Sequence, residues 1–189
     1  HEGAGVIAAV GEGVTNLAVG DHVVVAWSPP CGKCQSCVER KQPHLCVMIQ
    51  FAIAGTPRFT RNGEPVFGMA GTGTFAEYLT VPQEVVHKAE GVSLDQAAMV
   101  EFLAIGAHAV RRSGLRAGQR VLVVGAGPIG MAAMIFAKLR GAVVTALDGR
   151  QDRVDFCTSA LGIQAGVPLG EGDEERLAEL TGGEFFDVV

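Results

Sequence analysis

The sequence predicts an α/β fold in two parts, a small β-barrel or sandwich followed by a doubly wound parallel sheet. Up to about residue 90, short β-prone runs alternate with glycine, proline and asparagine, a pattern typical of small all-β domains. From Ser93 onward, strand-like apolar runs alternate with helical ones, which indicates βαβ units. We therefore expect domains at residues 1–92 and 93–189, and a hydrophobic content of 48% gives each a core to bury.

The expected elements follow from local patterns taken in chain order. In the first part, runs of β-branched and aromatic residues predict strands at 6–10, 23–27 and 75–79. In the second part, Ser93 followed by Gln96 predicts a capped helix start, and the apolar run to Arg112 indicates a mostly buried helix. The remaining elements are expected as strand 120–124, helix 128–139, strand 142–147, helix 151–161, strand 163–167, helix 174–180 and a last strand from 185.

Charge and hydropathy exclude several classes of partner. The net charge of −5 and the scattered basic residues argue against a nucleic-acid partner, which usually requires a basic stripe. The sequence shows neither a signal-peptide pattern nor an apolar run long enough to span a membrane, so we expect a cytoplasmic protein without a membrane partner. Because the chain opens at His1 instead of Met and stops within a strand-like run, we expect a fragment.

Four closely spaced cysteines form a metal-binding pattern. They are Cys31, Cys34, Cys37 and Cys46. Thiolates bind zinc at about 2.3 Å and a structural zinc takes four protein ligands, so the spacing predicts a closed structural zinc in a lobe at about residues 28–50. A disulfide cluster is the alternative, but it requires an oxidising compartment. Cys157 lies far away in the sequence and is expected to be a small buried apolar side chain.

A glycine-rich turn follows the strand at 120–124 and opens the next helix. It reads Gly125-Ala126-Gly127-Pro128-Ile129-Gly130. In a βαβ unit of this kind the first glycine permits the tight turn, the second lets the backbone approach a pyrophosphate, and the third allows close packing of helix on strand. The helix N-terminus then faces the phosphates. The sequence thus predicts a dinucleotide site here, and the alternative is a glycine-rich turn that binds nothing.

The choice of dinucleotide depends on the charged residues after the next strand. Asp148 ends that strand, where a carboxylate binds the adenosine ribose hydroxyls and repels a 2′-phosphate. We therefore expect NAD, with NADP less favoured, and include Arg153 among the cofactor-binding residues. Arg150 and Arg153 complicate the choice, since an arginine nearby can host a 2′-phosphate.

Taken together, these motifs resemble the zinc-containing medium-chain alcohol dehydrogenases. The resemblance rests on the opening His1-Glu2-Gly-Ala-Gly, on residues 19–23, on the four-cysteine lobe, and on residues 73–78 and 121–130. It implies a GroES-like β-barrel followed by a Rossmann domain, both incomplete. It also implies hydride transfer from a small-molecule alcohol, such as a polyol or sugar acid, to NAD in a homodimer or homotetramer.

The same resemblance implies a second, catalytic zinc. His1 and Glu2 match the end of the family's Gly-His-Glu motif, and Glu101 lies where polyol and sugar-acid dehydrogenases carry a glutamate, although Phe102 follows it instead of proline. The resemblance thus implies His1, Glu2 and Glu101 as the residues of the catalytic zinc site. A cysteine ligand from an earlier segment falls before residue 1, so we expect the fragment itself to be inactive. For Glu101 the alternative is an ion pair with one of the arginines at 111–112, and His108 is expected to be a hydrogen-bonded core histidine.

Departures from the family pattern leave the substrate open. The loop before Cys46 is one residue longer than in many relatives, and the insert at residues 47–73 resembles broader alcohol and aldehyde-adduct dehydrogenases. The region around Glu101 and the nucleotide half resemble the sugar-acid type instead. Two other functions compete with the dehydrogenase: a zinc-independent quinone or enoyl reductase of the same superfamily, and a zinc-stapled nucleotide sensor without catalysis.

Overall fold

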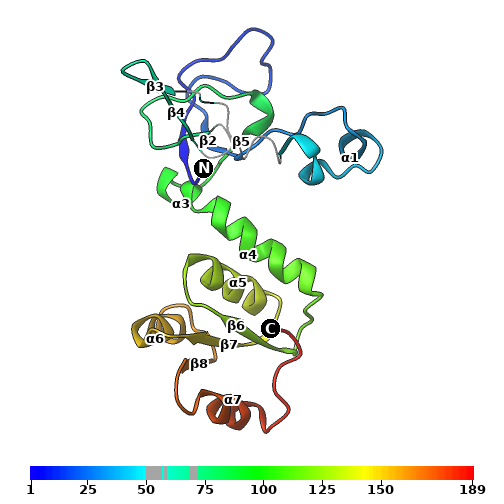
Figure 1. Cartoon of the computed structure of the whole chain (residues 1–189), viewed down its shortest axis with the longest axis vertical. Helices are drawn as coiled ribbons and strands as arrows, with labels where there is room; N and C mark the ends of the chain where they lie inside the picture. Colours follow the sequence, from blue (N-terminus) through cyan, green and yellow to red (C-terminus); the bar gives the residue numbers. More distant parts are fainter. Residues whose placement is uncertain (50–56, 58, 69–71) are drawn as a thin grey trace. The chain divides into compact units, whose positions relative to one another are not determined.

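A computed structural model describes residues 1–49, 57, 59–68 and 72–189 of the chain, which is drawn in Figure 1. The described residues divide into two compact units, His1–Glu101 and Phe102–Val189. The predicted domain boundary after residue 92 stays a prediction, because compact units do not by themselves define domains. The predicted insert at 47–73 lies partly outside the described residues.

Unit 1 is built on a three-stranded antiparallel sheet. Its strands are β1 (Ala4–Val6), β2 (His22–Val25) and β5 (Val86–Lys88), in the order β1-β2-β5. Val23, Val85 and Val86 form its buried core. Its remaining elements are α1 (Gln35–Val38), η1 (Pro43–Leu45), the hairpin of β3 (Phe59–Arg61) and β4 (Glu64–Val66), η3 (Gln83–Val85) and α3 (Leu94–Ala98).

Two of the strands predicted for unit 1 differ from the structure. Residues 75–79 do not form a strand, and Phe75 and Tyr78 are exposed. These side chains have the strand propensity that the prediction used, but propensity fixes a strand only where a partner strand and a face to bury are present. The predicted strand 6–10 also lies too far along the chain, since β1 ends at Val6.

The helical region after Ser93 is capped as predicted but is broken in two. The Ser93 side chain accepts the Gln96 N–H, and the Gln96 side chain accepts the Ser93 N–H, which together make a capping box. α3 ends at Ala98 with Met99 as its C-cap, and α4 (Val100–Ser113) follows. The prediction that this region is mostly buried is wrong, because within α4 only Gly106 and Val110 are buried.

Unit 2 is a parallel sheet with helices in the crossovers. Its elements are β6 (Arg120–Val124), α5 (Pro128–Leu139), β7 (Val143–Asp148), α6 (Gln151–Ser159), β8 (Ala165–Pro168) and α7 (Asp173–Thr181). The strand order is β6-β7-β8, and the chain then returns to the free edge of β6, where Val188 bridges Val121 in parallel. The strand order therefore reverses beside β6, the place where doubly wound folds bind ligands.

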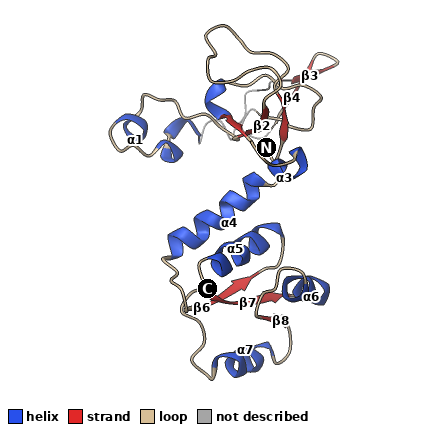
Figure 2. Ribbon diagram, turned by 180° about the vertical axis from the view of Figure 1, so that it is seen from behind, coloured by secondary structure: helices blue, strands red, loops and turns tan. Residues whose placement is uncertain are grey.

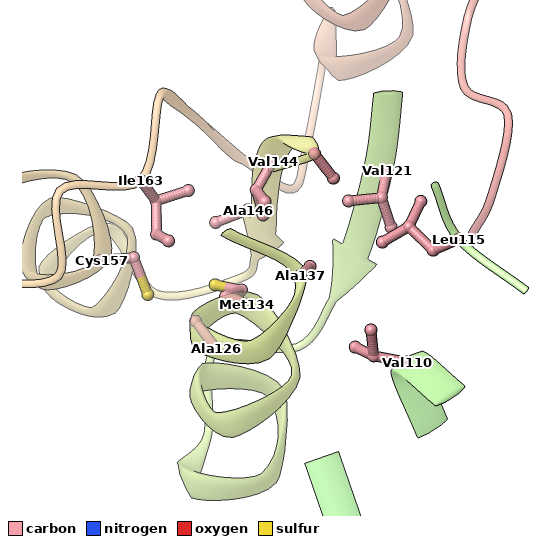
Figure 3. Close-up of a cluster of buried hydrophobic side chains, with 11 residues drawn as sticks. Val110, Leu115, Val121, Ala126, Met134, Ala137, Val144, Ala146, Cys157 and Ile163 are labelled. Atoms are coloured by element: carbon pink, nitrogen blue, oxygen red, sulfur yellow. The ribbon is translucent and has the colours of Figure 1, made fainter. Parts of the chain in front are cut away.

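The two faces of this sheet pack against different helices. Val121 of β6 and Val144 of β7 join a core with Met134 of α5 and Cys157 of α6, as Figure 3 shows. Leu122 and Leu147, which are odd numbers of residues from Val121 and Val144 and so lie on the other face of the sheet, pack with Leu177 of α7. In Figures 1 and 2, α5 and α7 accordingly lie on opposite sides of the strands. The α/β class with an antiparallel part followed by a parallel sheet is confirmed.

None of the helices in the described ranges is long and apolar enough to cross a membrane.

Gly106 marks a close approach of two helix backbones in unit 2. A Cβ at this position would lie 2.5 Å from the Ala133 nitrogen and 2.6 Å from the carbonyl carbon of Ala132 in α5. The obstacle is backbone rather than the end of a flexible side chain. Glycine in a helix normally costs about 1 kcal/mol relative to alanine, so here close packing must offset that cost.

We predict that Gly106→Ala lowers the free energy of unfolding by about 1–3 kcal/mol, the usual cost of overpacking. The measurement is urea denaturation followed by circular dichroism. Gly149→Ala is the matched control, because a Cβ there meets no atom within 4 Å. A Gly106→Ala protein as stable as the control would contradict the close approach.

Candidate functional sites

The four predicted cysteine ligands meet at one point in unit 1. Their sulfur atoms all lie within 4.8 Å of one another, with Cys34 Sγ 3.6 Å from Cys37 Sγ and 3.9 Å from Cys46 Sγ. Four sulfurs at 2.3 Å from a tetrahedral ion would be separated by about 3.8 Å, whereas a disulfide requires about 2.0 Å. All five cysteines of the chain are free thiols, so the arrangement fits a metal ion and not a disulfide cluster.

The local backbone orients these sulfurs. α1 begins directly after Cys34, and the Cys31 N–H donates to Cys46 Sγ at 3.2 Å. Backbone N–H donors to Cys34 lower its thiol pKa to about 6, while burial, followed by the Cys34 sulfur, raises the pKa of Cys37 to about 12. Crowded thiols thus do not all ionise without a cation, and a bound metal would deprotonate the whole set.

His1 and Glu101 lie far apart in the sequence but come together in unit 1. His1 Nδ1 lies 3.3 Å from Glu101 Oε1, and both side chains are about three-quarters or more buried. The two atoms are within ion-pair distance but not in hydrogen-bond geometry, so Nδ1 is buried without a hydrogen-bond partner among the described residues. Glu101 does not pair with an arginine at 111–112, the alternative weighed from the sequence.

The charges around Glu101 favour a cation. Burial, followed by the negative charge of Glu2, raises the pKa of Glu101. Glu2 itself is exposed. A buried imidazole nitrogen without a partner beside a carboxylate that is costly to ionise is an arrangement that a metal ion would satisfy. The residues present therefore fit a metal ligand set, although they supply only part of one.

His108 does not belong to this group. It is exposed, and its Nδ1 lies 3.0 Å from Nη2 of Arg111 on the same helix. The expectation of a core histidine is wrong, because position 108 falls on the outer face of α4. Cys157, by contrast, is buried in the sheet core as predicted.

The glycine-rich turn has the geometry that its three glycines predict. Gly125 has a φ of 101°, which side chains rarely adopt, and a Cβ at Gly130 would overlap the Gly125 carbonyl oxygen. At Gly127, the N-cap of α5, no atom of the described residues lies within 4 Å of the Cβ position. Pro128 and Ile129 open the helix behind it. The turn therefore combines a tight bend, an open approach and close packing at the carboxyl end of β6.

Asp148 connects this turn to the end of β7. Its Oδ2 accepts the Ala126 N–H at 2.7 Å and its Oδ1 accepts the Arg150 N–H at 2.8 Å. These two backbone donors lower the pKa of Asp148, with smaller contributions from Arg153 and Arg150. A carboxylate has about four acceptor positions, so this anion can still accept hydrogen bonds from a diol.

Two arginines follow Asp148, and they lie in different environments. Arg153 Nη1 lies 3.9 Å from Asp148 Oδ2. The Arg150 guanidinium is bound instead to Asp152, with Nε 3.0 Å from Oδ1 and Nη2 2.6 Å from Oδ2. The sequence does not single out Asp152 as a partner of Arg150. The one indication of this pairing is the opposite charges at 150 and 152.

The predicted site residues therefore form three groups. The first is the cysteine cluster, the second is His1 with Glu101 and the nearby charge of Glu2, and the third is the glycine-rich turn with Asp148 and Arg153. The first two groups lie in unit 1 and the third lies in unit 2.

Comparison with known proteins shows similarity to dehydrogenases along the whole chain. The family model of the alcohol dehydrogenase GroES-like domain matches residues 1–91. The whole chain is 36% identical to the probable D-xylulose reductase A of Emericella nidulans, of which it covers 50%. It is also 35% identical, again over its whole length, to the 2-dehydro-3-deoxy-L-galactonate 5-dehydrogenase of Pseudoalteromonas atlantica, of which it covers 51%. The chain spans about half the length of the curated relatives it matches.

A solved structure of a dehydrogenase is also similar to this chain. The crystal structure of an NAD-dependent alcohol dehydrogenase is similar with a TM-score of 0.74 and 32% sequence identity. The similarity covers 98% of the present chain and 51% of the other. Both the antiparallel and the parallel part are therefore shared with that protein.

We predict that Cys46→Ser abolishes metal binding at the cysteine cluster, because Cys46 is the most buried of the four thiols and its sulfur also accepts the Cys31 N–H. Elemental analysis should show one metal ion fewer per chain, and thermal unfolding should occur at a lower temperature. Cys157→Ala is the control, since it removes a buried thiol outside the cluster and should leave the metal content unchanged. Equal metal content in the Cys46→Ser and parent proteins would contradict the site.

Proposed function

Because this chain belongs to the zinc-containing medium-chain alcohol dehydrogenase family, we propose that it is part of an NAD-dependent dehydrogenase that oxidises a polyol or sugar acid. The observation that carries the proposal is the approach of His1 Nδ1 to Glu101 Oε1. Two potential metal ligands that lie far apart in the sequence are brought together there, and the imidazole nitrogen has no hydrogen-bond partner among the described residues. A sensor without catalysis has no need of such a group.

Each group of residues has a separate task in this proposal. Cys31, Cys34, Cys37 and Cys46 hold a zinc ion with all four positions filled, which stabilises the lobe and leaves no room for substrate. His1 and Glu101 hold the catalytic zinc, with Glu2 as a further negative charge beside it. A zinc ion there would polarise the substrate hydroxyl, and bound NAD would accept the hydride.

The residues of unit 2 bind and orient the cofactor. Backbone N–H groups at the start of α5 face the pyrophosphate, and the open position at Gly127 lets the phosphates approach. Asp148, ionised and held by two backbone donors, accepts hydrogen bonds from the ribose hydroxyls. Arg153, 3.9 Å from that carboxylate, lies at the edge of the same site.

The substrate class follows from the relatives and from Glu101. The names of two relatives refer to xylulose and to a deoxygalactonate, both of which are polyhydroxylated. An oxygen ligand at Glu101 agrees with the polyol and sugar-acid type rather than with the broader alcohol dehydrogenases. Polyols and aldonic acids are therefore the substrates to test first.

We predict that the whole protein reduces NAD in the presence of a polyol or an aldonic acid, measured by absorbance of the product, and binds two zinc ions per chain. Glu101→Ala should lower this activity by about 100-fold or more and remove one zinc. Glu12→Ala, an exposed carboxylate in the same unit, serves as the control. A protein with a single zinc and no activity on any alcohol would refute the proposal and favour the nucleotide sensor.

We further predict that Asp148→Ala raises the dissociation constant of NAD about tenfold or more, since charge-assisted hydrogen bonds contribute about 1.5–3 kcal/mol. NADP binding should change far less, because its 2′-phosphate is repelled by the same carboxylate. Fluorescence titration with the reduced cofactors measures both constants. Asp148→Asn separates charge from hydrogen bonding, because it keeps an acceptor oxygen for the Ala126 N–H. Equal losses for both cofactors would show that Asp148 only supports the fold of the turn.

A further inference from the structure

The two arginines after Asp148 offer positive charge beside the proposed ribose site. Asp148 itself carries a negative charge that would repel the 2′-phosphate of NADP. The backbone of Arg150 is held next to Asp148, because its N–H donates to Asp148 Oδ1 at 2.8 Å. Its guanidinium is carried two positions after Asp148, the carboxylate that would bind the ribose. An arginine in such a position is the group that hosts the 2′-phosphate in enzymes that use NADP.

In this structure the Arg150 guanidinium already has an anionic partner. Asp152 accepts from both Nε and Nη2, at 3.0 and 2.6 Å, in the bidentate geometry that a phosphate would also use. A 2′-phosphate and the Asp152 carboxylate would thus compete for the same face of the guanidinium. Arg153 is the less suitable host, since the nearest anion to it is Asp148 itself.

We propose that Asp152 is a specificity-determining residue, which binds the Arg150 guanidinium and so withholds it from the 2′-phosphate of NADP. The inference rests on the proposed cofactor site at Asp148. It assigns the preference for NAD to two carboxylates that act differently: Asp148 repels the phosphate directly, and Asp152 occupies the cation that would attract it.

The size of the effect is set by the exposure of the pair. The side chains of Arg150 and Asp152 are 61% and 65% exposed, and exposed ion pairs contribute little because water and salt screen them. Releasing Arg150 should therefore change the NADP affinity by about threefold, not by orders of magnitude. The effect should shrink at high salt, since screening weakens both the ion pair and the attraction of the freed guanidinium for phosphate.

The test measures NADH and NADPH dissociation constants by fluorescence titration for the whole protein and four variants. Asp152→Asn removes the charge but keeps the side-chain shape, and should tighten NADPH about threefold while NADH changes little. Arg150→Ala in the parent protein should leave both constants nearly unchanged, because the guanidinium is already occupied. Adding Arg150→Ala to Asp152→Asn should cancel the gain in NADPH affinity.

The fourth variant, Asp155→Asn, removes an equal charge from the same helix, where Asp155 accepts from Gln151 and not from an arginine. If it tightens NADPH as much as Asp152→Asn does, the effect is one of overall charge and the inference is overturned. Unchanged NADPH binding in Asp152→Asn, with NADH still bound, overturns the inference alone. A protein that binds neither reduced cofactor overturns the proposed cofactor site as well.

Discussion

The glycine-rich turn of unit 2 is held by the hydrogen bond from the Ala126 N–H to Asp148 Oδ2, beside the backbone hydrogen bond from the Gly125 N–H to the Leu147 carbonyl. These two bonds tie the glycine-rich turn after β6 to the end of β7, so that the two neighbouring strands end in a single connected structure. The Asp148 side chain is only 11% exposed, and a carboxylate in that setting must be well supplied with donors to remain charged. The same carboxylate thus shapes the turn and keeps a negative charge at the mouth of the site.

The sequence predicted the second half of the chain far better than the first, for a physical reason. In unit 2 the elements carry local signals, such as the glycine-rich turn before α5, and β6 and α5 have the predicted bounds. Strands in unit 1 depend on partners distant in the sequence. Residues 75–79 have strong strand propensity, yet they form no strand, because pairing and not propensity decides such segments.

Site residues show the same division. The cysteine cluster could be predicted because short spacings along the chain force the thiols together. The pairing of Arg150 with Asp152 could not, because both arginines near Asp148 are equally good candidates until their side-chain partners are known. The exposure of His108 was missed since the helical pattern places it two turns from Glu101, and that pattern does not show which face of α4 is covered.

The meeting of His1 with Glu101 also has a consequence for the architecture of unit 1. These residues lie far apart in the sequence of unit 1, whose apolar core is small. An ion held by both would act as a cross-link that closes the long loop between residues 1 and 101, and closing long loops removes the most freedom from the unfolded chain. A metal ion bound at this point would then also stabilise the folded state of unit 1.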